Sequence, residues 1–171
     1  MWKFIRAKPV VLSATPDPGT NPTIYQLYID SHWGRAYGLI MPPENGNPVP
    51  TILVAEDEEA IREMVGSVLS DAGYRVILAA SGRDAVNAAK NHKGPIHLLF
   101  ADVTMPDFGG VEIAAKLASQ YPGMKVLFTS GNSMENIITE GILGPGHEFI
   151  AKPFNLKDML GKVKAILSGP G

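Results

Sequence analysis

Four short apolar segments of this chain are each followed by a side chain that can bind phosphate or a metal ion. The side chains are Glu56 with Asp57, Asp102, Ser130 and Lys152, which follow residues 52–55, 97–101, 125–129 and 148–151, respectively. If the segments are neighbouring parallel strands, their carboxyl ends lie at the sheet edge where open α/β sheets bind ligands. The sequence therefore predicts one crevice containing three carboxylates, a hydroxyl group and an ammonium group.

Such a set of groups suits phosphoryl transfer. Three carboxylates a few ångströms apart repel one another unless a cation lies among them, and Mg²⁺ prefers such hard oxygen ligands. The charges of the carboxylates, Mg²⁺ and Lys152 sum to zero, which leaves the site receptive to a phosphoryl group. Asp102 can then act as the nucleophile and form an acyl phosphate. Mg²⁺ and Lys152 would stabilise the phosphoryl oxygens, and Ser130 could donate a hydrogen bond to the product.

Each residue also has a simpler interpretation when taken alone. Asp57 could be no more than a helix cap, Asp102 could be a turn aspartate, and Ser130 could lie in an ordinary loop. Lys152 is more specific, because a following proline in the cis form would fix the direction of the ammonium group. The occurrence of all of them in this order, each at a strand end, favours a common site.

The region from Thr51 onward alternates between strand and helix patterns. The expected strands cover residues 52–55, 74–79, 96–101, 124–129 and 147–151. Helices are expected between them and after the last strand, with starts indicated by Ser81, Ser133 and Asn155 and an end at Gly73. Five strands alternating with five helices predict an α/β fold, a doubly wound parallel sheet with helices on both faces. This pattern leaves the strand order open.

The composition is that of a globular protein. Hydrophobic residues make up 45% and charged residues 19% of 171 residues, and the net charge of −2 indicates neither a nucleic acid nor a membrane as a partner. No apolar stretch is long enough to cross a bilayer, and the basic start lacks the apolar core of a signal peptide. The absence of cysteine fits a reducing compartment. We expect a cytoplasmic protein.

Residues 1–50 have a different texture. They are rich in proline, glycine, asparagine and threonine, and we expect an irregular, partly disordered N-terminal extension and linker before a domain that covers residues 51–168. Residues 23–29 alternate enough to form a strand but have no evident partner.

The four strand-end segments together resemble the response-regulator receiver domain of two-component signalling, the CheY-like family. The resemblance rests on Leu53–Glu58, Phe100–Pro106, Phe128–Gly131 and Lys152–Phe154, and it is greatest to the receivers of hybrid sensor histidine kinases. It implies the strand order 2-1-3-4-5 of a flavodoxin-like sheet. It also implies that Asp102 receives a phosphoryl group from a phosphohistidine on a kinase or phosphotransfer protein. The implied Mg²⁺ ligands are Glu56, Asp57, Asp102 and the backbone carbonyl of Thr104.

The same resemblance assigns a switch. Ser130 would be the switch hydroxyl, Lys152 the phosphate-contacting lysine and Phe149 the switch aromatic. Three positions differ from the commonest family pattern: Glu56 replaces aspartate, Ser130 replaces threonine, and Phe149 lacks the tyrosine hydroxyl. We expect the signal to leave by docking of a protein partner or by onward phosphate transfer, since no output domain is recognisable in the chain.

Three other functions remain possible from the residues. An aspartate-nucleophile phosphatase would need an acid at the position of Thr104, and a nucleotide or flavin binder would need a phosphate loop where Glu56 and Asp57 stand. A receiver-like module that is never phosphorylated would keep the fold without the chemistry. The four histidines, His32, His92, His97 and His147, show no metal-ligand spacing.

Overall fold

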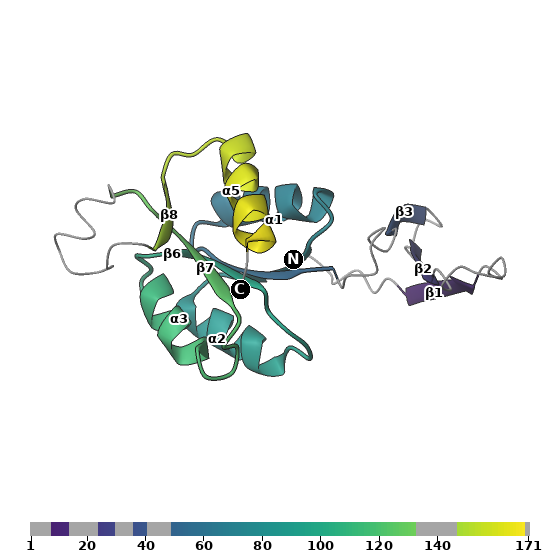
Figure 1. Cartoon of the computed structure of the whole chain (residues 1–171), viewed down its shortest axis with the longest axis horizontal. Coiled ribbons are helices and arrows are strands. Elements are labelled where there is room, and N and C mark those ends of the chain that lie inside the picture. The colour runs from purple at the N-terminus through teal and green to yellow at the C-terminus, as the bar shows by residue number, and fades with distance from the viewer. Residues whose placement is uncertain (1–7, 14–23, 30–35, 41–48, 133–146, 170–171) are drawn as a thin grey trace. The chain divides into compact units, whose positions relative to one another are not determined.

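The computed structural model describes residues 8–13, 24–29, 36–40, 49–132 and 147–169. The chain divides into two units, residues 1–49 and 50–171, and each is described by itself. The first unit contains a three-stranded antiparallel sheet in the order β1-β2-β3 (Figure 1). Its strands are β1 (Lys8–Ser13), β2 (Ile24–Ile29) and β3 (Ala36–Ile40). The strand that the sequence indicated without a partner is therefore the centre of a small sheet.

The second unit is built on a five-stranded parallel sheet. Its strands are β4 (Thr51–Ala55), β5 (Arg75–Ala79), β6 (Leu98–Asp102), β7 (Lys125–Ser130) and β8 (Glu148–Ala151). Their order is β5-β4-β6-β7-β8, and all neighbours are parallel. Numbered within this unit, that is the order 2-1-3-4-5, so the predicted doubly wound fold is confirmed.

Helices cover both faces of this sheet (Figure 1). The described helices are α1 (Glu59–Asp71), α2 (Gly82–Asn91), α3 (Gly110–Leu117) and α5 (Leu156–Ser168). Helices α1 and α5 lie on one face, and α2 and α3 lie on the other. The expected helix that begins at Ser133, with Met134, Ile137 and Ile138, lies outside the described residues.

The strand sequences account for the position of the core. Strands β4 and β6 are buried along their whole length, which is why they are almost continuously apolar. Their side chains alternate between the two faces: Leu53 and Leu99 pack with residues of α2 and α3, whereas Val54 and Phe100 pack with residues of α1 and α5. This two-sided core holds the central strands, and with them the residues at their carboxyl ends, in fixed register.

Two helix starts expected from the sequence are confirmed. The Ser81 hydroxyl accepts a hydrogen bond from the Asp84 amide at 3.1 Å at the start of α2. The Asn155 side-chain oxygen accepts one from the Asp158 amide at 2.8 Å at the start of α5. Within the described part of the chain, no helix is both long and apolar enough to cross a membrane.

Candidate metal and phosphoryl-transfer site

The strand order brings the predicted site residues to one edge of the sheet. Ala55 of β4 pairs with Ala101 of β6, so Glu56 and Asp102 are the next residues on adjacent strands. Ser130 ends β7 and pairs with Ala151, the residue before Lys152. Five residues distributed over almost 100 positions of sequence therefore come from the ends of four neighbouring strands.

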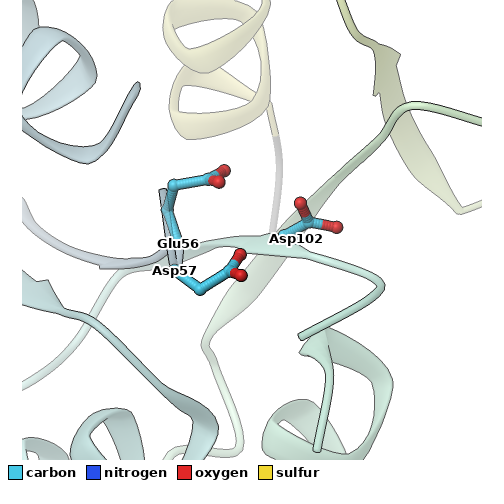
Figure 2. Close-up of side chains that lie close together, drawn as sticks. All are labelled: Glu56, Asp57 and Asp102. Carbon is cyan, nitrogen blue, oxygen red and sulfur yellow. The ribbon is translucent and has the colours of Figure 1, made fainter. Parts of the chain in front are cut away.

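The three carboxylates form one cluster (Figure 2). Glu56, Asp57 and Asp102 each offer an oxygen within 4.8 Å of the others. Glu56 is fully buried and Asp102 is 6% exposed, whereas Asp57 is open to solvent. The cluster thus has a closed inner side and an open outer side, so a ligand can approach it past Asp57.

Lys152 lies among these carboxylates. Its Nζ atom is 2.5 Å from Asp102 Oδ2 and 2.9 Å from Glu56 Oε1, to both of which it donates hydrogen bonds. It follows β8, and its peptide bond with Pro153 is cis, the form considered from the sequence. The one ammonium group leaves the three carboxylates with a net charge of about −2 when all are ionised.

The pKa values of Glu56 and Lys152 are both raised, but for different reasons. Burial raises the pKa of Glu56 above its ordinary value of 4.5, although the Lys152 ammonium acts in the opposite direction. Burial alone would lower the pKa of Lys152, but its hydrogen bonds to Asp102 and Glu56 outweigh that effect and hold the pKa above 10.5. The site therefore keeps its ammonium group charged, whereas burial makes the charged form of Glu56 less favourable than in water.

A divalent cation fits this donor set. Glu56 Oε2 is buried and accepts no hydrogen bond, although Nζ lies 2.8 Å away. A buried carboxylate oxygen with an unused acceptor position is costly, and it is the type of ligand that Mg²⁺ takes. Three carboxylates with one open side meet the need of an ion that keeps several waters.

The other predicted residues lie next to this cluster. The Thr104 amide donates to Asp102 Oδ1 at 2.8 Å, and the Thr104 side chain is exposed. Ser130 is buried, and its hydroxyl accepts a hydrogen bond from the Asn132 amide at 3.1 Å. Phe149 is half-buried in β8 and packs against the small cluster of Val103 and Phe128.

Replacement of Glu56 by glutamine is expected to stabilise the metal-free protein and weaken Mg²⁺ binding. In the wild-type protein the folded-state pKa of Glu56 is raised. The Glu56 carboxyl group therefore stabilises the fold below about pH 4.5 and loses that contribution as the pH rises through the folded-state pKa. At pH 8 the variant should therefore gain roughly 0.5–2 kcal/mol in free energy of unfolding. Its Mg²⁺ dissociation constant should rise by more than about tenfold.

Thermal unfolding between pH 4 and pH 8, with and without Mg²⁺, measures both effects of this change. The gain over wild type should shrink as the pH falls toward 4.5. Glu63→Gln on the exposed surface of α1 is the matched control and should change neither property. A metal-free Glu56→Gln protein that melts below wild type at pH 8 would contradict the prediction.

Two residues that support the site were missed from the sequence. Arg62 of α1 donates from Nη1 to the carbonyl oxygens of Glu56 at 2.8 Å and Asp57 at 3.1 Å, and so braces the loop after β4. Asp107 connects the loop after β6 to the start of α2. Both act on backbone groups, and no local sequence pattern distinguishes such an arginine or aspartate from a solvated one.

Residues 52–164 match the model of the response regulator receiver domain. The chain belongs to this family. It therefore carries a receiver domain of two-component signalling, as the sequence motifs predicted, and receiver domains interact with histidine kinases or phosphotransfer proteins.

Individual curated relatives are consistent with this family. The chain is 33% identical over 128 residues to the probable transcriptional regulatory protein TcrX of Mycobacterium tuberculosis, and the match covers 74% of this chain and 53% of TcrX. It is 32% identical over 117 residues to the sensor kinase CckA of Brucella abortus, covering 68% of this chain and 12% of CckA. The chain spans about half the length of the first curated relatives that it matches.

One solved structure with the same fold was determined with a ligand bound. The response regulator TrrA of Thermotoga maritima, in complex with Mg²⁺-BeF, is 26% identical with a TM-score of 0.57. The match covers 69% of this chain and 99% of that one. The fold of the described residues from Pro50 onward is thus that of known response regulators.

Proposed function

We propose that this receiver domain accepts a phosphoryl group on Asp102 from a phosphohistidine of a histidine kinase or phosphotransfer protein. The observation that carries the proposal is the position of the Lys152 ammonium, which contacts Asp102 Oδ2 and Glu56 within a three-carboxylate cluster. A lone aspartate in a turn would have no reason to share a cation with a second acid at the end of another strand.

The chemistry follows from the positions of these groups. A carboxylate oxygen of Asp102 attacks the phosphorus atom, the new O–P bond forms, and the P–N bond to the donor imidazole breaks. The imidazole nitrogen keeps the electron pair of that bond and then takes up a proton. Lys152 lies beside Asp102 and stabilises charge on the phosphoryl oxygens, while the Thr104 amide holds the other carboxylate oxygen in place.

A magnesium ion would be held by the carboxylates of Glu56, Asp57 and Asp102 and by the Thr104 carbonyl. When bound, it supplies positive charge that offsets the carboxylates and the developing charge on the phosphoryl oxygens. Lys152 cannot do this alone, because one ammonium group leaves the cluster negative, and a negative site repels an incoming phosphoryl group. The only reactions catalysed by the domain would be its own phosphorylation and dephosphorylation.

The same proposal includes the output. The phosphoryl group adds about −2 charge and several strong acceptors at the edge of the sheet. Movement of the Ser130 hydroxyl toward it would favour a more buried position of the Phe149 ring, and so change the surface around β8 and α5 that a partner protein contacts. Because the phosphohistidine donors of such relays obtain their phosphate from ATP inside the cell, we place the protein in the cytoplasm.

Incubation of the protein with acetyl phosphate and Mg²⁺, followed by intact-mass measurement, tests the proposal. We expect a gain of one phosphoryl group that requires the metal, disappears with EDTA, and is removed by hydroxylamine, as acyl phosphates are. A protein that binds Mg²⁺ but gains no mass from acetyl phosphate or from a phosphorylated phosphotransfer protein would instead be a receiver-like docking module. That result would overturn the proposal.

A further inference from the structure

The loop that follows the phosphoacceptor strand is fastened to a distant helix by Asp107. Its Oδ1 atom accepts hydrogen bonds from the amides of Gly82 at 3.0 Å and Phe108 at 2.8 Å, and its Oδ2 atom accepts one from the Arg83 amide at 2.8 Å. Gly82 and Arg83 are the first residues of α2. Hydrogen bonds from the Arg83 and Phe108 amides lower the pKa of Asp107 to about 2, so this carboxylate is charged at neutral pH.

Two glycines show how tightly the loop is held. A Cβ atom on Gly82 would overlap the carbonyl oxygen and ring of Phe108, and a Cβ atom on Gly109 would overlap the carbonyl group of Val103. Any other residue at these positions would push the loop away from α2 or from its own start. At Gly82 and Gly109 the chain therefore approaches the loop backbone closely, with no space for a side chain between them.

The near end of the loop is fixed by the site itself. The Val103 amide donates to the Thr129 carbonyl of β7 at 2.8 Å, and the Thr104 amide donates to Asp102 Oδ1 at 2.8 Å. The path of the backbone from Thr104 onward, and with it the direction of the Thr104 carbonyl, then depends on where the loop is next held. Among the hydrogen bonds of the described residues, those that Asp107 accepts are the next ones along the chain that hold the loop.

We infer that Asp107 is a positioning residue that holds the Thr104 backbone carbonyl in place for the divalent cation by fastening residues 103–109 to the start of α2. This inference rests on the proposed function, because the Thr104 carbonyl is a proposed metal ligand. It goes beyond that function by making metal affinity depend on α2, which contributes no ligand to the site.

If Asp107 did no more than cap α2, its loss would have a different effect. Helix α2 has a second cap, since the Ser81 hydroxyl accepts a hydrogen bond from the Asp84 amide. Ser81 does not contact the loop in any hydrogen bond that the described residues show. Loss of either side chain should weaken α2 by a similar mechanism, but only loss of Asp107 should release the loop. Ser81→Ala is therefore a matched control for helix destabilisation.

Calorimetric titration of Mg²⁺ into the full chain, together with thermal unfolding, separates these roles. We expect Asp107→Ala to raise the Mg²⁺ dissociation constant by about tenfold, the loss typical of an outer support of a metal site. Ser81→Ala should lower the midpoint of thermal unfolding but leave the dissociation constant within about twofold of wild type. Asp107→Asn, which keeps an acceptor for the Gly82 amide, should lie between wild type and Asp107→Ala, and it replaces the alanine variant if that one does not fold.

Two results would overturn the inference. One is an unchanged Mg²⁺ dissociation constant in both Asp107 variants, and the other is an equal rise in Ser81→Ala. Failure of the proposed function looks different, because wild type itself would then bind no Mg²⁺ or gain no phosphoryl group. Wild-type binding with no loss in the Asp107 variants contradicts only the positioning role.

Discussion

Asp102→Asn is expected to lose phosphorylation by acetyl phosphate almost completely, with a fall in rate of roughly three orders of magnitude or more. The amide nitrogen is not a nucleophile, and its oxygen lacks the charge that attacks phosphorus. The variant should nevertheless fold, because the asparagine oxygen can still accept the hydrogen bond that the Thr104 amide donates to Oδ1. Intact-mass spectrometry against time measures the rate.

The control for Asp102→Asn is Asp71→Asn, an exposed acid at the end of α1. It removes one negative charge without touching the site, and its rate should equal that of wild type. A phosphoryl group that still appears on Asp102→Asn at the wild-type rate would show that another residue is the acceptor. Peptide mapping after borohydride reduction would then identify it.

Lys152→Met is expected to reduce both stability and phosphorylation. Without the ammonium group, Glu56 and Asp102 are left as neighbouring buried carboxylates, since Lys152 is the cation that pairs with both. We expect a loss of about 2–3 kcal/mol in free energy of unfolding at pH 8 without metal, less than for a fully buried pair because water reaches Lys152. The phosphorylation rate should fall by about 100-fold, since a preorganised cation beside the phosphoryl oxygens is lost.

Urea unfolding and the mass assay separate these two effects. The stability loss should diminish as the pH falls, because loss of the ammonium raises the already elevated pKa of Glu56 further and the group then takes up a proton. Added Mg²⁺ should restore part of the stability but not the rate. Lys157→Met, at an exposed position at the start of α5, should change neither. A Lys152→Met protein with the stability and phosphorylation rate of wild type would show that Lys152 takes no part in the site.

The meeting of the five site residues could be predicted because each lies at or directly after the end of a strand, and parallel strands end at one edge. Which strands are neighbours could not be read from their apolar residues, because Leu53 and Leu99 would be equally buried in several strand orders. The order was predictable only through the resemblance to the receiver family. The structure then gave the detail that spacing does not contain: Glu56 is fully buried, whereas Asp57 next to it is exposed.

Other features were beyond prediction for identifiable physical reasons. Asp107 accepts hydrogen bonds from amides that lie 24 and 25 residues away, and backbone amides carry no residue-specific signal. The strand of residues 8–13 contains Pro9, which argues against a central strand. Among the described strands β1 lies at the edge of its sheet and pairs with β2 alone, and proline is tolerated at that position.

The last strand supplies the cation of a site whose acids come from the first and third strands of the same sheet. During synthesis, a chain that has emerged only as far as residue 132 already contains Glu56, Asp57, Asp102 and Ser130, but not Lys152. Its carboxylates would face one another without their ammonium partner. A phosphohistidine donor would therefore react much faster with chains whose synthesis and sheet assembly have passed β8, so incomplete or truncated copies would draw little phosphate from the relay.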